Sequence, residues 1–145
     1  MLAFLILLLY ATPNGGSDLE KARDAQDRPA LEKLTAQALS AAQSKANDPS
    51  AQYRLALAES YVAEVAIEVR DKNAAHNAAE IGIDAAKKAV ALKGDSAEYH
   101  RLLGTLCGQA ISANVLQGMK YGHCAQAEVN KAVQLDPKAS VNYLA

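Results

Sequence analysis

The chain has 145 residues, with 15 Lys and Arg against 16 Asp and Glu, and 50% of its residues are hydrophobic. This length is enough for one domain with a sizeable buried core. The net charge of −1 gives no bulk attraction to nucleic acid or to an anionic membrane surface. Aromatic residues make up 5% of the chain while 31 residues are Ala, which argues against a β-sandwich or barrel and for helices. Two Cys are too few for a disulfide scaffold.

The first eleven residues, 1–11, form an unbroken apolar run that is followed by the helix-breaking stretch 12–16. A helix of eleven residues spans about 16 Å, which is too short for a bilayer core of about 30 Å. The length suits the central region of a secretory signal peptide, although no Lys or Arg precedes it. We therefore expect residues 1–16 to be a leader and the rest of the chain to be exported, into a periplasm. The alternatives are a membrane tether and an apolar element packed on a cytoplasmic domain.

Helical periodicity extends over the rest of the chain. The spacing of Ser17 and Glu20 is that of a capping box, and Asp27 is expected to cap the next helix. Further helices are predicted over 51–70, 74–92, 97–116 and 123–135, and Gly94 is expected to end one of them in a left-handed conformation. The connectors are predicted at 71–73 and 118–122. The fold class predicted is all-α.

Two parts of the chain are similar to each other. Residues 50–54 align with residues 96–100 at an offset of 46, and residues 88–92 align with residues 131–135 at an offset of 43. Such self-similarity is typical of stacked helix pairs. We therefore predict an α-solenoid of antiparallel helix pairs that is a fragment of a longer array. Its expected parts are a capping segment (17–49), two repeats (50–95 and 96–138) and the start of a further repeat (139–145).

This pattern resembles the tetratricopeptide repeat family, in an elongated form similar to that of exported bacterial proteins. In that family small residues let paired helices approach closely, while larger residues fill the space between neighbouring pairs. The repeats here, of 43 and 46 residues, are longer than the family's usual 34. The packing positions that the resemblance implies are Leu57, Ala58, Tyr61, Gly82, Ala89, Leu103, Gly104, Cys107, Ala125, Val129, Ala132 and Pro137.

The resemblance also implies a concave groove, lined by residues of the first helix of each pair. The residues carried over to this groove are Gln52, Leu55, Glu59, Val62, Glu98, Arg101, Thr105 and Gly108. Their mixture of apolar and charged side chains suits an extended peptide or a partner helix.

The histidines and cysteines form no recognisable chemical site. His100 and Cys107 are about 10 Å apart on one helix face, and the chain has no Cys-x-x-Cys pair for zinc. We expect Cys107 and Cys124 to be free thiols, because Cys124 would lie near a turn and Cys107 two to three turns from it. Motifs for nucleophilic catalysis and phosphate loops are absent from the sequence. Glu59 and Glu64 are expected on a solvated helix face.

The sequence therefore predicts a protein-interaction scaffold that binds a protein or peptide, with no catalysis, metal or cofactor. Self-association through the C-terminal end is a further prediction. Nucleic acid is not expected as a partner, and membrane contact is expected only through an uncleaved leader. Two alternatives stay open: a periplasmic solute-handling component of a transporter, and a small helical enzyme that uses Cys107 and His123.

Overall fold

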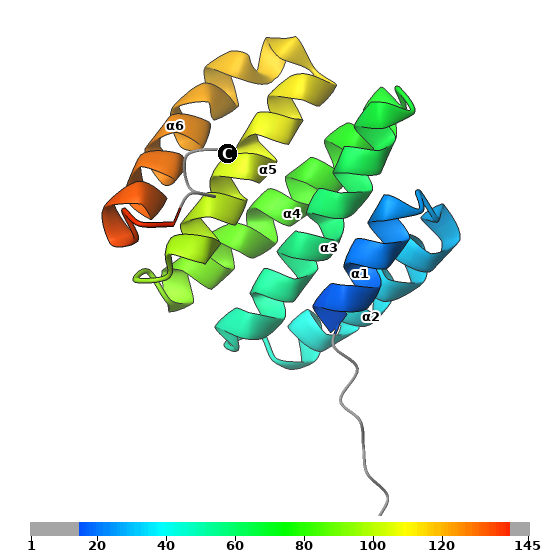
Figure 1. Ribbon diagram of the computed structural model, residues 1–145, viewed down its shortest axis with the longest axis horizontal. Coiled ribbons are helices and arrows are strands. Elements are labelled where there is room, and N and C mark those ends of the chain that lie inside the picture. The colour runs from blue at the N-terminus through cyan, green and yellow to red at the C-terminus, as the bar shows by residue number, and fades with distance from the viewer. Residues whose placement is uncertain (1–14, 140–145) are drawn as a thin grey trace, which may run out of the picture.

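The computed structural model describes residues 15–139 (Figure 1). The predicted leader and the predicted further repeat therefore fall almost entirely outside the described residues. Within this range the protein contains helices and no strand, which confirms the all-α prediction. The helices are α1 (Gly15–Asp24), α2 (Arg28–Ser44), α3 (Pro49–Glu68), α4 (Lys72–Leu92), α5 (Ala97–Ala113), the 3-10 helix η1 (Val115–Gln117) and α6 (Gly118–Leu135).

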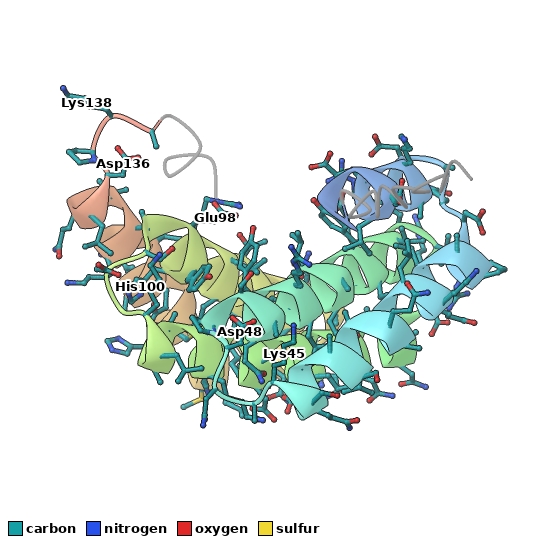
Figure 2. All side chains as sticks on the ribbon, turned by 90° about the horizontal axis from the view of Figure 1, so that it is seen from below. Lys45, Asp48, Glu98, His100, Asp136 and Lys138 are labelled. Carbon is teal, nitrogen blue, oxygen red and sulfur yellow. A yellow bond between two sulfur atoms is a disulfide. The ribbon has the colours of Figure 1, made fainter. Side chains whose placement is uncertain are left out.

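Consecutive helices pack as antiparallel neighbours, so that α1–α2, α3–α4 and α5–α6 form three pairs (Figure 1). The first helices of the pairs are also neighbours, because α3 packs against both α1 and α5. In the side view of Figure 2, α1 and the end of α6 rise on the same side of the row, and this face is concave. The largest core lies where α3, α4 and α5 meet.

The turns inside the first two pairs use the same local structure. Gln26 and Arg70 adopt left-handed conformations, with φ of 51° and 59°, at the ends of α1 and α3. The next residue in each turn, Asp27 or Asp71, caps the following helix by accepting a hydrogen bond from a backbone N–H. No described glycine has a positive φ, so the expectation of a left-handed Gly94 is wrong.

Two helix starts also differ from the prediction. Helix α1 begins at Gly15, which leaves Ser17 inside the helix instead of capping it. Helix α5 ends at Ala113, and the side chain of Asn114 caps η1 by accepting from the N–H of Leu116 at 3.1 Å. Helix α6 then begins at Gly118, so the predicted connector 118–122 is helical. Glycines were expected to break the helix here, but packing against α5 overrides their weak helix propensity.

The structure changes the repeat offset for the first helices. The N-cap residues of α3 and α5 are Asp48 and Ser96, which are 48 residues apart rather than 46. Gln52 and His100 are then equivalent, and both reach back to carbonyls at the end of the preceding helix. The C-caps of α4 and α6, Lys93 and Asp136, are 43 residues apart, as the sequence predicted.

Most of the predicted packing positions lie in the helix interfaces. Buried among them are Ala58, Gly82, Ala89, Leu103, Gly104, Cys107 and Ala132, and partly buried are Leu57, Tyr61, Ala125 and Val129. Pro137 is exposed. Small residues in the interfaces allow α3, α4 and α5 to approach closely, because a bulkier side chain would hold the backbones apart.

Substitutions at two glycines of α5 can test how closely α5 and α6 are packed. A Cβ placed on Gly104 would lie 2.9 Å from Val129 Cγ2 and 3.2 Å from the Ala125 carbonyl oxygen, whereas a Cβ on Gly108 would meet nothing within 4 Å. Both Ala substitutions gain the same helix propensity. We therefore expect Gly104→Ala to be less stable than Gly108→Ala by about 1–3 kcal/mol because of overpacking. Urea unfolding of the two variants measures this difference, and equal stabilities would contradict the interface as described.

Candidate functional site

The eight residues predicted to line one groove do not lie together. Gln52, Leu55 and Glu59 are only 3%, 5% and 7% exposed, so the groove prediction is wrong for these three. Val62 is half-buried in the core, and Glu98 is half-buried between Tyr53 and Arg101. The remaining three residues, Arg101, Thr105 and Gly108, line a hollow beside α5.

The two-residue change in repeat offset explains this outcome. Successive residues of a helix are rotated by about 100°, so a shift of two positions turns the expected face by about 200°. At the structural offset of 48, the equivalents of Arg101, Thr105 and Gly108 are Tyr53, Leu57 and Ser60. Gln52 and Leu55 lie instead beside a separate hollow of about 550 Å³ between α2 and α4.

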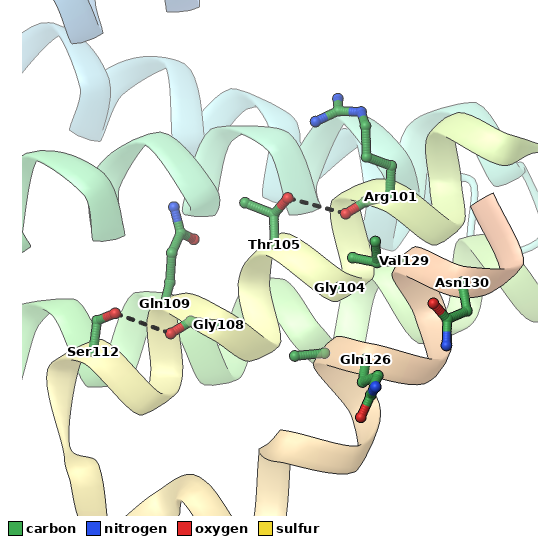
Figure 3. A pocket seen from close by; sticks show the side chains of 10 residues that line it. Arg101, Gly104, Thr105, Gly108, Gln109, Ser112, Gln126, Val129 and Asn130 are labelled. Atoms are coloured by element: carbon green, nitrogen blue, oxygen red, sulfur yellow. Dashed lines mark hydrogen bonds between the residues drawn. The ribbon is translucent and has the colours of Figure 1, made fainter. Parts of the chain in front are cut away.

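The hollow that contains Arg101, Thr105 and Gly108 is an open groove of about 830 Å³ between α5 and α6, here named the α5–α6 groove (Figure 3). Its volume is in the range of ligand sites. Its lining residues are Arg101, Gly104, Thr105, Gly108, Gln109 and Ser112 from α5, and Ala125, Gln126, Val129 and Asn130 from α6.

Several polar side chains of the groove already form hydrogen bonds within α5. The hydroxyls of Thr105 and Ser112 donate to carbonyls of their own helix at 3.0 and 3.1 Å, so they present mainly carbon to the groove (Figure 3). The guanidinium of Arg101 donates two hydrogen bonds to Glu98, which raise its pKa. The floor is formed by small residues, which suits the close approach of another backbone.

The α5–α6 groove has an occupied counterpart one pair earlier in the chain. Tyr53 and Ser60 of α3 contact α5: Tyr53 stacks on Tyr99 with ring centroids 4.9 Å apart, and Ser60 donates to Gln109 at 3.1 Å. Their equivalents in the α5–α6 groove are Arg101 and Gly108, and those of Ala56 and Leu57 on the same face are Gly104 and Thr105.

The second helices of the pairs agree with this equivalence. Gly82 of α4 packs against Leu106 of α5, and at the offset of 43 its counterpart in α6 is Ala125, which lines the groove. The groove on α5 and α6 is thus equivalent to the groove on α3 and α4 in which α5 sits.

Cys107 and Cys124 form a disulfide that joins the two walls of the groove, with Cα atoms 6.1 Å apart. The prediction of free thiols is therefore wrong. It assumed that the last helix begins near residue 123, which would put Cys124 at the turn. Because α6 begins at Gly118, both cysteines lie nearly two turns from the α5–α6 corner and face each other.

Helix α6 has few other attachments. Only Tyr121 and Ala132 of α6 are buried, and the helix packs on α5 and η1. The Glu128 carboxylate lies 2.5 Å from His100 Nδ1, and the hydroxyl of Tyr121 donates to Glu80 of α4. The hydrogen bond from Tyr121, with a further one from Lys120, holds the pKa of Glu80 below its usual value.

Glu59 is buried rather than solvated, which corrects the expectation for this residue. It packs beside Gly82 of α4, and burial raises its pKa to about 7. Among residues 15–139, no basic side chain forms a salt bridge with Glu59. It is thus a buried carboxylate in the helix interface, outside the groove.

The histidines and cysteines considered for chemistry do not come together in the described residues. No group of three or more His, Cys, Asp or Glu within residues 15–139 could hold a metal ion. Cys107 has no thiol in this oxidised form and is 0% exposed, while His123 is exposed. No helix in the described range has the length and apolar character needed to cross a bilayer.

Residues 18–145 match the family model described as regulator of microtubule dynamics protein 1-3. The chain belongs to this family. The match covers most of the chain and replaces the assignment to the tetratricopeptide repeat family, which was wrong because it rested on small-residue spacing that other stacked helix pairs share. No curated protein and no solved structure matches the chain significantly.

Sequence reasoning missed several groove residues of this family member. Gln109, Ser112, Gln126 and Asn130 were not selected, since they do not stand between the packing positions of the repeat. The signal that could have found the α6 wall was the offset of 43, which relates Ala125 and Val129 to Gly82 and Ala86.

Burial of Glu59 makes the stability of the protein depend on pH. A raised pKa means that the folded protein keeps this proton up to about pH 7, while the unfolded chain releases it near pH 4.5. The stability associated with the protonated form is present at low pH and is lost as the pH rises through 7. We expect Glu59→Gln to stabilise the protein by about 1–2 kcal/mol at pH 8, after allowance for partial hydration, and hardly at all at pH 4.5.

Urea unfolding at the two pH values measures the effect of this substitution. Glu64→Gln, which removes a carboxylate from a partly exposed position of the same helix, is the matched control. A pH-independent effect of Glu59→Gln would refute the buried, protonated carboxylate.

The Cys107–Cys124 disulfide contributes to the stability of the fold. The bond closes a loop with a sequence separation of 17, and opening it releases conformational entropy in the unfolded chain. We expect the Cys107→Ser, Cys124→Ser double variant to be less stable by about 3 kcal/mol in the absence of reductant. Denaturant unfolding of both proteins with and without dithiothreitol checks this, and the variant should not respond to the reductant. A double variant as stable as the oxidised protein would contradict a stabilising role of the disulfide.

Proposed function

We propose that this chain is a protein-interaction scaffold that binds a helical segment of a partner in the α5–α6 groove and has no catalysis of its own. The observation that carries the proposal is the equivalence between this groove and the α3–α4 surface that holds α5. A surface built on the same plan, with small residues on its floor, favours the same kind of occupant. On this proposal, the three pairs are units of an α-solenoid.

The chemistry of the groove supports a helix similar to α5. In the internal pair, Tyr53 stacks on Tyr99 and donates its hydroxyl to Glu98. The groove has Arg101 at the position of Tyr53, and a guanidinium both stacks on aromatic rings and pairs with carboxylates. The proposed ligand is therefore a helix with an aromatic or acidic residue in its first turn and apolar residues one and two turns later.

The disulfide supports the proposal that the protein works in an oxidising compartment after export. Disulfides persist outside the cytosol and are rare within it. The family description favours a second candidate partner, a microtubule or a protein bound to one. The disulfide and the family description imply different compartments, since cytosolic thiols stay reduced. The oxidation state of Cys107 and Cys124 in the source cells, read by alkylation and mass spectrometry, distinguishes them.

A peptide that copies residues 96–113, with Cys107→Ser and a fluorescent label, tests the groove by fluorescence anisotropy on the oxidised protein. We expect saturable binding that Gly108→Leu weakens by about tenfold or more, because its side chain fills open floor space. A peptide copying residues 28–44, from the outer layer, should bind more weakly.

Gly122→Leu is the matched control for this substitution. Gly122 also has open space around its Cβ position and stands on α6, but it does not line the groove. Its affinity for the peptide should stay within about twofold of the original protein. No saturable binding, or equal binding to Gly108→Leu, would refute the proposed function.

A further inference from the structure

The α6 wall of the groove depends on attachments that are unevenly distributed along the helix. Near its C-terminal half, the Glu128 contact with His100, the packing of Val129 on Gly104 and the buried Ala132 hold α6 to α5. Between Tyr121 and Ala132, no residue of α6 is buried. The part of the wall that contributes Ala125 and Gln126 therefore has no fully buried side chain, and Ala125 is only partly buried against the core.

The disulfide lies in the middle of α6, next to the groove. Cys124 directly precedes Ala125 and Gln126, and its partner Cys107 directly precedes Gly108 on the groove floor. Cys107 is fully buried, while Cys124 is partly exposed. The bond thus adds a covalent link between the two walls at the level of the groove floor, beside the packing of Ala125 and Val129 on Gly104.

We propose that the Cys107–Cys124 disulfide controls the α5–α6 groove, which holds its binding shape in the oxidised chain and loosens when the bond is reduced. The inference rests on the proposed function and adds its regulation. Partner binding is then confined to conditions in which the bond has formed. The reduced chain keeps its α3–α4 core, because the main attachments of that core do not involve α6.

The reduction is a two-electron exchange with a dithiol. A thiolate of the dithiol attacks Sγ of Cys124, the more exposed partner, and forms a mixed disulfide while the Cys107 sulfur leaves and takes up a proton. The second thiol of the dithiol then displaces Cys124. The products are two cysteine thiols in the protein and one disulfide in the oxidised dithiol.

Two measurements on the full chain test this proposal, before and after treatment with dithiothreitol. Hydrogen exchange followed by mass spectrometry should show amides of residues 118–127 exchanging about tenfold faster or more in the reduced protein, while the amides of α3 and α4, which exchange by global unfolding, stay the slowest of the chain. The affinity of the peptide copying residues 96–113 should fall by about tenfold.

The Cys107→Ser, Cys124→Ser variant should match the reduced protein in both measurements and should not respond to dithiothreitol. Equal exchange of residues 118–127 in the two redox states would overturn the proposal, and so would complete loss of protection across α3 and α4, which would mean that the bond holds the whole fold rather than the groove. If the peptide fails to bind even the oxidised protein, the proposed function fails, while hydrogen exchange still decides whether the bond holds α6 in place.

Discussion

Close approach between neighbouring helices is the constraint on which this structure depends. The interfaces are built from Ala and Gly, and Gly82 and Gly104 leave no room for a Cβ without displacing a neighbour. Helices that approach this closely gain many weak dispersion contacts, which offsets the small apolar surface of each side chain. The same closeness makes polar groups at the interface important, since a buried group without a partner is costly. Gln52 and His100 meet this requirement by bonding to carbonyls at the end of the preceding helix.

The all-α class, the cap at Asp27 and the 43-residue offset of the second helices could be predicted from local patterns. These features depend on capping chemistry and hydrophobic periodicity, both of which lie within one helix. The left-handed residues could not be predicted, because Gln26 and Arg70 carry no sequence signal for that conformation. The helical state of Gly118 and Gly122 was missed because tertiary packing decided it.

The site was harder to predict than the fold, for a geometrical reason. A repeat offset that is wrong by two residues still gives the right helices, but it turns the expected face to the opposite side of the helix. Gln52, Leu55 and Glu59 were misplaced in this way, while Arg101, Thr105 and Gly108 line the α5–α6 groove. The disulfide was missed for a related reason, since five residues at the start of α6 decide whether Cys124 faces Cys107. Which residues line the groove depends on the rotational phase of the helices, which single-sequence patterns define poorly.

On the proposed function, folding and partner binding would use the same kind of helix packing in this protein. Helix α5 completes the surface of the pair before it, and its own pair then presents an equivalent surface with no described helix on it. An occupant of that surface would add to the row what α5 adds to α3 and α4, through small-residue contacts on the floor and one polar anchor at Arg101. The difference lies in the walls. In the inner pair α4 is held from both sides, by α3 and α5, whereas α6 packs mainly on α5, bonds to α4 through Tyr121 and Glu80, and is linked to α5 covalently. On the proposed function, the covalent link at the α6 wall adds to the rigidity that α5 supplies for α4 in the inner pair.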